Sequence, residues 1–407
     1  MDRVRNPYAP GAGSPPPELA GREKIMDEAR ILIGRTKAGK PTQGIIIVGL
    51  RGVGKTVLLS EIRKLAEADE YAVVFIEARE GEKFAEMIVP PLREILYGLS
   101  SVDKARSLAA RGLRVLKSFV SSLSVTIEGV TFGLGVEPET GVADSGDLQS
   151  DLPRLLEVVG EAATAAARSV ILLVDEIQYL HPAEFSALIM AVHRVNQRQM
   201  PIAMVAAGLP QTLGLAGNSK SYAERLFRYP EVGALDDRSA RRALEEPART
   251  EGVQFSRAAI DRILEVTKRY PYFLQQWGYD AWNTAQASPI SIDDVDTASR
   301  RSIEELDQSF FKVRFDRCTP AEKRALAALG PGKQRSGDVA EQLGLKVTSL
   351  GPVRNALIRK GMIYSPAHGD TAFTVPLFDE FMKRAMPEPM QASRSRPSPA
   401  GSTNSDR

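Results

Sequence analysis

The sequence predicts an α/β fold in which a parallel sheet carries helices on both faces, followed by a mainly helical second half. Two observations lead to this fold class. Apolar runs of strand length alternate with stretches of helical spacing through the first half of the chain. These runs show no apolar–polar alternation, which is typical of strands buried on both faces of a parallel sheet. After Asp236 the helical spacing dominates.

The elements of the first half are expected in a simple order. Strands are expected at 44–49, 72–76, 170–174 and 202–207, and helices at 23–36, 56–69, 82–97, 152–167 and 182–196. Between Val125 and Val136 apolar residues alternate with polar or small ones around Glu128-Gly129, which predicts a β-hairpin. Because this hairpin, at about 123–137, interrupts the strand–helix alternation, we interpret it as an insertion.

The second half is expected to contain two helical regions. The first has helices at 237–245, 256–267, 272–286 and 292–311. The second has three short helices at 319–329, 336–343 and 348–360, followed by two short strands at 362–364 and 372–375. Thr319-Pro320-Ala321-Glu322 combines a capping residue, a proline at the first helical position and an acid in the first turn, so it predicts a helix start.

The two ends of the chain differ from the rest in composition. Both are rich in Pro, Gly and Ser and are expected to be disordered. We therefore expect a disordered arm at 1–18, an α/β domain at 19–235, a helical region at 236–312, a final domain at 313–386 and a disordered tail at 387–407.

Composition excludes several classes of protein. A single cysteine, Cys318, excludes a disulfide within the chain and a cysteine zinc site. The apolar runs are too short for a membrane span, and the first residues lack a secretory signal, so we expect a cytoplasmic protein without membrane contact. Residues 317–386 hold eleven Lys and Arg against six Asp and Glu. This surplus favours nucleic acid as a partner, although a solvated basic face would give the same count.

A phosphate-binding loop is predicted where the first strand meets the second helix. Residues 49–56 match the pattern G-x-x-x-x-G-K-[ST] in full. Glycines let the backbone N–H groups surround phosphates, Lys55 would reach the β and γ phosphates, and the following helix directs its positive end at the same anion. The predicted nucleotide-binding residues here are Gly49, Leu50, Arg51, Gly52, Val53, Gly54, Lys55, Thr56 and Val57.

Two carboxylates follow the third strand. Val170–Val174 runs directly into Asp175 and Glu176. Asp175 and the Thr56 hydroxyl are expected to hold Mg²⁺ together with ATP, and Glu176 is expected to orient and polarise the attacking water. The alternative is that both carboxylates simply mark the exit of the strand to solvent.

Together these motifs resemble the AAA+ and related STAND signal-transduction ATPases, especially the branch of archaeal and eukaryotic origin-recognition initiators. Leu19-Ala20-Gly21-Arg22-Glu23 is similar to the GRE box, which in the family lies near the adenine. Walker A corresponds to Gly49–Thr56 and Walker B to Leu172–Glu176. The resemblance implies a helical lid at 236–312 and a C-terminal winged helix, and it covers Leu19 to Met386.

Some family positions do not transfer cleanly. The strand 202–207 ends in Ala206-Ala207-Gly208, where the family has a polar sensor residue, so we expect slow hydrolysis. Arg225 is the candidate arginine finger, with Arg228 second, but a surface arginine is an equally good interpretation. Pro271 corresponds to the proline of the STAND lid motif, and it also suits a plain helix start.

The C-terminal region has the spacing of a helix-turn-helix with a wing. Its third helix would enter the major groove of double-stranded DNA. The candidate contacts are Lys346, Thr348, Ser349, Arg354, Arg359 and Lys360. Winged helices also serve as protein-docking or purely structural modules, so this alternative stays open.

These features predict an ATP-dependent molecular switch. Nucleotide would set the lid, and with it a winged-helix module that binds DNA, as in an initiator-like or mobile-element ATPase. A nucleotide-dependent homo-oligomer is expected if Arg225 completes a neighbour's site. The alternative is a STAND-type signalling ATPase whose winged helix contacts protein instead of DNA.

Overall fold

The computed structural model describes residues 1–11, 13–123, 137–219, 223–367 and 369–386, and the chain divides into two compact units, Met1–Glu304 and Glu305–Arg407. The second unit begins inside the helix expected at 292–311. The β-hairpin expected at about 123–137 and the tail expected at 387–407 lie outside the described residues, apart from the hairpin's first and last positions.

The first unit is built on a parallel sheet with the strand order β2-β3-β4-β1-β5, and β6 also pairs with β1. β1 and β3 are buried along their whole length, as their unbroken apolar runs predict. The strands are β1 (Gly44–Gly49), β2 (Ala72–Glu77), β3 (Val170–Asp175), β4 (Ile202–Gly208), β5 (Phe227–Arg228) and β6 (Glu231–Val232). The predicted parallel sheet is confirmed.

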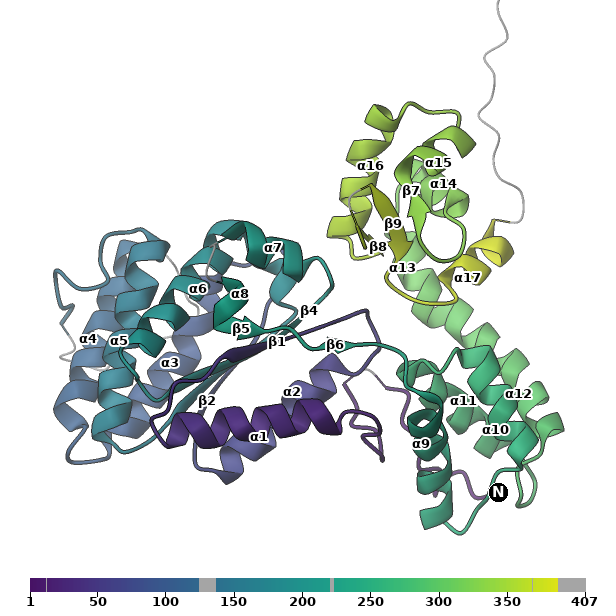
Figure 1. Ribbon diagram of the computed structural model, residues 1–407, viewed down its shortest axis with the longest axis horizontal. Helices are drawn as coiled ribbons and strands as arrows, with labels where there is room; N and C mark the ends of the chain where they lie inside the picture. Colours follow the sequence, from purple (N-terminus) through teal and green to yellow (C-terminus); the bar gives the residue numbers. More distant parts are fainter. Residues whose placement is uncertain (12, 124–136, 220–222, 368, 387–407) are drawn as a thin grey trace, which may run out of the picture. The chain divides into compact units, whose positions relative to one another are not determined.

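Helices cover both faces of this sheet, with α1 and α2 on one face and α3, α5 and α6 on the other (Figure 1). Right-handed crossovers require this division. The connection from β1 to β2 crosses the sheet in one direction, and the connections from β2 to β3 and from β3 to β4 run in the opposite direction. The helices are α1 (Glu23–Lys37), α2 (Lys55–Ala68), α3 (Phe84–Ser100), α4 (Arg106–Ser122), α5 (Leu148–Ala165), α6 (Pro182–Gln197), α7 (Thr212–Ser219) and α8 (Ala223–Leu226).

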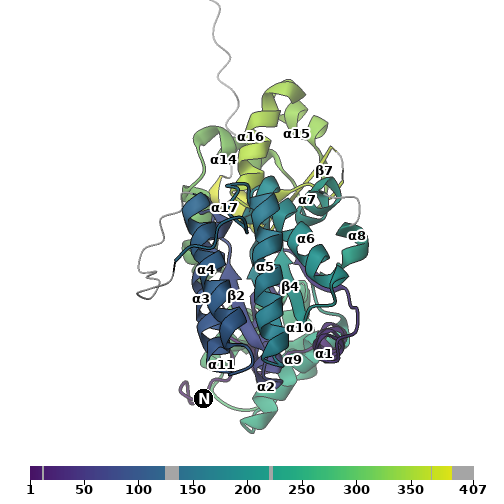
Figure 2. The same cartoon turned by 90° about the vertical axis from the view of Figure 1, so that its left-hand side faces the viewer.

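The sequence did not predict helix α4. It packs against α3 and α5 as an additional layer outside the sheet (Figure 2). Gly112 lies so close to α3 that an added Cβ would be 2.5 Å from Leu96 Cδ2. Leu113, Leu116 and Phe119 are buried in the same core as α3 and α5. Tertiary packing therefore stabilises a helix that contains a central glycine.

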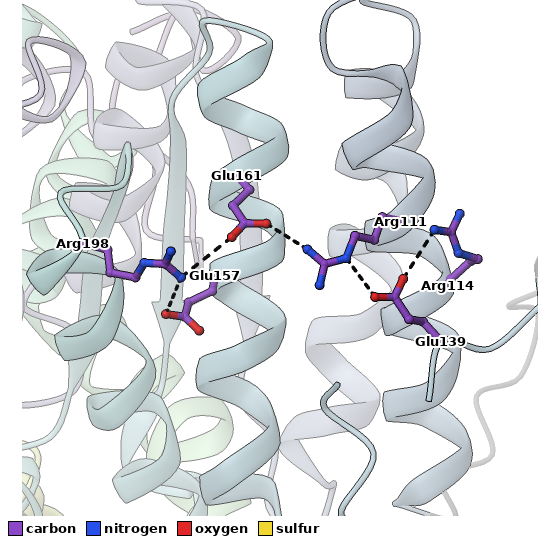
Figure 3. Close-up of polar contacts among 6 residues, drawn as sticks. All are labelled: Arg111, Arg114, Glu139, Glu157, Glu161 and Arg198. Atoms are coloured by element: carbon purple, nitrogen blue, oxygen red, sulfur yellow. Dashed lines mark hydrogen bonds and ion pairs between the residues drawn. The ribbon is translucent and has the colours of Figure 1, made fainter. Parts of the chain in front are cut away.

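A ladder of ion pairs joins α4, α5 and α6 on the surface of this layer (Figure 3). Arg111 pairs with Glu139 at 2.8 Å and with Glu161 at 3.1 Å. On the other side of α5, Glu157 accepts from Arg194 at 2.7 Å and from Arg198 at 2.9 Å. The Glu157 side chain is 8% exposed, so this carboxylate depends on its two arginines for compensation.

Four further helices complete the first unit: α9 (Asp237–Thr250), α10 (Arg257–Thr267), α11 (Pro271–Thr284) and α12 (Ile292–Glu305). Side-chain caps fix two of their starts. Asp236 accepts from Ser239 N at the start of α9, and Ser256 accepts from Ala259 N at the start of α10. We refer to α9–α12 as the lid helices, after the lid expected at 236–312, and their role as a lid stays a prediction.

The first residues of the chain differ from the disordered arm that was expected at 1–18. Tyr8 is buried, donates its hydroxyl to Leu244 O in α9 and packs on Gly278, where an added Cβ would lie 2.7 Å from the Tyr8 ring. Trp282 Nε1 donates to Asp2 O at 2.8 Å. The segment is therefore held against the lid helices, because a buried aromatic and several hydrogen bonds offset the entropy of ordering it.

The second unit combines helices with a small antiparallel sheet that has the strand order β7-β9-β8. Phe311, Phe378 and Phe381 pack together in its core. Thr319 and Glu322 form the expected capping box at the start of α14. Its elements are a π-helical turn η2 (Leu306–Phe311), α13 (Lys312–Asp316), α14 (Pro320–Ala328), β7 (Gln334–Arg335), α15 (Ser336–Gln342), α16 (Val347–Arg359), β8 (Ile363–Tyr364), β9 (Asp370–Phe373) and α17 (Phe378–Ala385).

The lengths and polarities of the helices in the described residues give no candidate for a membrane span.

The ion-pair ladder predicts an acid-sensitive contribution to stability. Burial alone would raise the pKa of Glu157, but the hydrogen bonds from Arg194 and Arg198 hold it below its ordinary value. A depressed pKa stabilises the folded state above the ordinary carboxyl pKa, and this contribution is lost as the pH falls through the lower value. Replacing Glu157 by Gln should lower the free energy of unfolding by about 1–2 kcal/mol at about pH 7.

Urea unfolding at about pH 7 and about pH 4 measures this effect. The destabilisation caused by Glu157→Gln should begin to shrink at the lower pH, because the carboxyl group of the unfolded wild type then takes up a proton that the folded carboxylate, with its lower pKa, still resists. Glu86→Gln, which changes an acid in the first turn of α3 outside the ladder, serves as the control. An equal loss at both pH values would contradict the assignment.

Candidate nucleotide site

The loop between β1 and α2 has the backbone that phosphate binding requires. Gly52 and Gly54 have φ angles of +79° and +91°, a left-handed conformation that side chains rarely adopt. Gly49 also has no room for a side chain, since an added Cβ would lie 2.4 Å from Val232 O of β6. Gly54 immediately precedes α2, so the loop leads directly into the helix N-terminus.

Lys55 is buried at the start of α2. Its Nζ donates to Leu50 O at 3.0 Å, so the side chain folds back over the loop. Burial lowers the pKa of Lys55, while the nearby Glu176 and Asp175 carboxylates oppose that shift. A buried cation beside a glycine-rich loop at a helix N-terminus is suited to phosphate oxygens.

The two predicted metal ligands lie in contact. Thr56 Oγ1 donates to Asp175 Oδ2 at 2.6 Å, although the residues are far apart in the sequence. Burial raises the pKa of Asp175, and the bond from Thr56 opposes this shift. A hydroxyl and a carboxylate are oxygen donors of the kind that Mg²⁺ prefers, so this pair fits the metal that accompanies ATP.

Glu176 turns sharply out of β3. Its φ angle is +49°, uncommon for a residue with a side chain. Its N donates to Asp175 Oδ1 at 2.8 Å, and its carboxylate accepts from Gln178 Nε2 in the 3-10 turn η1 (Ile177–Tyr179). Gln178 is a residue of the site that the motifs did not reveal, since it follows Walker B without a spacing signal of its own.

The lid helices reach the phosphate loop at the start of α11. Tyr272 N donates to Gly52 O at 3.2 Å, and the Tyr270 hydroxyl donates to Arg51 O. Pro271 is the first residue of α11 and lies between these two contacts in the chain. Arg51 in turn donates from Nη2 to the Tyr179 hydroxyl at 2.7 Å. The sequence pointed to Pro271, whose contact with nucleotide stays a prediction, but to neither of the tyrosines beside it.

Arg22 of the GRE-like segment lies beneath the loop. Its side chain is buried, and Nη2 donates to Val53 O at 3.2 Å and to Gly233 O at 2.7 Å. It therefore fastens the phosphate loop to the segment that leads from β6 to the lid.

Arg225 lies elsewhere. It belongs to the short helix α8, and Gln43 Nε2, next to the start of β1, donates to Arg225 O at 2.8 Å. The phosphate loop follows the other end of β1, so Arg225 is not part of its own chain's phosphate site. With Arg228 and Arg35, Arg225 lines a surface hollow of about 520 Å³.

The candidate DNA contacts of the second unit fall into two groups. Arg354 donates to Thr371 Oγ1 and to Asp370 O, both at 2.8 Å, and Lys360 pairs with the buried Glu322 at 2.7 Å. These two side chains therefore hold α16 to β9 and to α14. The other four candidates are exposed: Lys346, Thr348, Ser349 and Arg359.

Comparison with known families agrees with this geometry. Residues 18–205 match the family described as an AAA ATPase domain. Residues 18–205 therefore form an AAA ATPase domain. Residues 308–382 match a second family, described as a domain of unknown function (DUF8462). No curated protein matched the chain in a sequence comparison.

Solved structures resemble this chain at low sequence identity, and one of them has a TM-score above one half. The Walker-type ATPase PABY2304 of Pyrococcus abyssi is 15% identical, with a TM-score of 0.55 over 90% of this chain and 96% of that one. The Aeropyrum pernix Orc1 protein in complex with DNA is 14% identical, with a TM-score of 0.47 over 94% and 96% of the two chains. The Thermotoga maritima RuvB Holliday junction branch migration motor is 15% identical, with a TM-score of 0.42 over 89% and 96%.

The buried lysine gives a direct test of the phosphate site. Lys55→Ala should weaken MgATP binding at least tenfold, about 1.4 kcal/mol, because the cation facing the phosphates is removed. Titration with a fluorescent ATP analogue measures the affinity. Lys64→Ala, an exposed lysine on the same helix that pairs with Glu61, is the matched control and should bind like the wild type. Equal affinity of Lys55→Ala and wild type would refute the site.

Proposed function

We propose that this AAA+ ATPase is a slowly hydrolysing molecular switch, in which the nucleotide sets the lid helices and the lid controls DNA binding by the second unit. The contact between lid and phosphate loop carries the proposal. Tyr272 N and the Tyr270 hydroxyl bond to the carbonyl groups of Gly52 and Arg51, in the loop that would surround the phosphates. A nucleotide that reorders this loop changes the partners of α11, so its presence is transmitted to the lid.

Hydrolysis in this proposal depends on Glu176. Its carboxylate would orient and polarise the attacking water, while Thr56 and Asp175 would hold Mg²⁺ and Lys55 would face the β and γ phosphates. Mg²⁺ supplies charge neutralisation on the phosphate oxygens when it is bound. Slow turnover follows from β4, which ends in Ala206, Ala207 and Gly208 and brings no polar side chain to the γ phosphate.

Self-association would complete the site. Arg225 is exposed and lies at the opposite end of β1 from its own phosphate loop, so it can act as an arginine finger only on a neighbouring copy. We propose a nucleotide-dependent homo-oligomer arranged in this way.

DNA binding is proposed for the exposed start of α16. Lys346, Thr348 and Ser349 are exposed together at this end, and Arg359 is exposed at the other. An exposed helix N-terminus with polar and basic residues is suited to phosphates and base edges. The three-helix arrangement with the β8–β9 strand pair agrees with a winged helix, whose wing would be formed by that pair.

A signalling ATPase with a protein-docking second unit is the alternative. One observation favours it: Leu345 and Val347 flank Lys346 and are 47% and 55% exposed. Apolar side chains in this place suit a protein partner as well as a groove.

ATP turnover tests the switch. Wild type should hydrolyse ATP slowly and faster with duplex DNA, whereas Glu176→Gln should lose at least about 100-fold in kcat and still bind MgATP. An equimolar mixture of Glu176→Gln and Arg225→Ala should regain activity, because each supplies the residue that the other lacks. Wild-type protein without turnover under all conditions would remove the hydrolysis claim and leave only nucleotide binding.

DNA binding is tested by comparing variants of the exposed basic residues with a variant of a basic residue that is bonded within the unit. Lys346→Ala and Arg359→Ala should each weaken binding to duplex DNA and reduce the slope of log K against log salt by about 1. Arg354→Ala should instead lower the unfolding temperature of the protein, because Thr371 and Asp370 lose their partner. Fluorescence anisotropy across a salt series measures the slopes. Unchanged affinity and slope in both exposed variants would favour the protein-docking alternative.

A further inference from the structure

The side-chain amide of Gln178 joins the turn after β3 to the end of β4. Its Nε2 donates to the Glu176 carboxylate, and its Oε1 accepts from Leu209 N at 3.0 Å. Leu209 directly follows Gly208, the last residue of β4. Because one partner is an acceptor and the other a donor, the two bonds together define which way the amide faces.

The end of β4 has no space for a side chain of its own. A Cβ added at Gly208 would lie 2.4 Å from Thr212 Oγ1, 2.8 Å from Ile177 Cγ2 and 3.1 Å from Gln178 Oε1. Thr212 is fully buried at the start of α7, so it cannot move aside cheaply. The polar groups beside this strand end therefore come from other segments: the Thr212 hydroxyl from α7 and the Gln178 amide from the turn after β3.

Glu176 depends on its surroundings for its conformation. Its left-handed backbone is unfavourable for a residue with a side chain and persists only where neighbouring bonds fix it. Two hydrogen bonds to its main-chain atoms do so. Glu176 N donates to Asp175 Oδ1 at 2.8 Å, and Glu176 O accepts from Tyr179 N at 3.0 Å. Both hold the backbone, whereas Gln178 holds the carboxylate.

We propose that Gln178 is a positioning residue for hydrolysis. It binds Glu176 Oε2, which leaves Oε1 to accept a hydrogen bond from the attacking water. It also ties this carboxylate to the end of β4, in place of the polar side chain that Gly208 cannot carry. The proposal rests on the proposed role of Glu176 in hydrolysis and adds a second residue on which kcat depends.

Two variants test this role. Gln178→Ala removes both bonds, and Gln178→Glu keeps the size but replaces the donor to Glu176 by a second carboxylate. Both should lower kcat at least about tenfold and leave KM and MgATP affinity within about twofold, because the interaction orients a group needed only in the transition state. Gln197→Ala, an exposed glutamine at the end of α6, is the control and should match the wild type.

The outcomes distinguish a failure of this proposal from a failure of the proposed function on which it rests. If Glu176→Gln abolishes turnover while both Gln178 variants keep the wild-type kcat, Gln178 has no positioning role. A raised kcat would also overturn it, since Gln178 would then restrain Glu176 rather than position it. Parallel losses of kcat, nucleotide affinity and unfolding temperature in both variants would show a merely structural role. If Glu176→Gln hydrolyses ATP like the wild type, the proposed function itself fails.

Discussion

The hydrogen bond between Thr56 and Asp175 holds together the two halves of the nucleotide site. Thr56 lies in the first turn of the helix after β1, and Asp175 ends β3, with β4 lying between these strands in the sheet. The bond can form because parallel strands bring their carboxyl ends to the same edge, and because β1 and β3 are anchored along their length by full burial. A shift of either strand would separate the hydroxyl from the carboxylate and move Glu176 away from Lys55. The rigidity of the sheet is therefore a condition for the chemistry at its edge.

The phosphate loop and the two carboxylates at this edge of the sheet could be predicted from the sequence, whereas the side chains around them could not. The phosphate loop and the two carboxylates are local patterns, each attached to a buried strand. Gln178, Tyr270 and Tyr272 have no such pattern, because what they contact is decided by which loops meet in space. Gly208 illustrates the difference. Sequence alone shows a missing side chain, whereas the structure shows that Thr212 and Gln178 fill its place.

The errors outside the site have the same origin. Helix α4 contains Gly112 and was missed because a central glycine weakens local helix propensity, yet that glycine allows close packing on Leu96. The first residues were expected to be disordered from their composition, yet Tyr8 alone supplies a buried aromatic ring that fits over Gly278. Arg354 and Lys360 were grouped with the exposed basic residues by type, but their partners Thr371 and Glu322 come from other elements of the unit.

Burial disfavours the charged forms of Lys55 and Asp175, the two ionisable groups at the centre of the site. It lowers the pKa of Lys55 and raises that of Asp175, so each group is costly to keep ionised without a partner. The folded chain offsets part of this cost internally, through the carbonyl of Leu50 at Lys55 and the hydroxyl of Thr56 at Asp175. Phosphates offer Lys55 a negative partner but would also repel Asp175 and Glu176, whereas a divalent cation offers Asp175 a positive one. When the phosphates and the divalent cation bind together, Lys55 and Asp175 each gain a partner of opposite charge. This arrangement therefore favours a metal–nucleotide complex over either component alone.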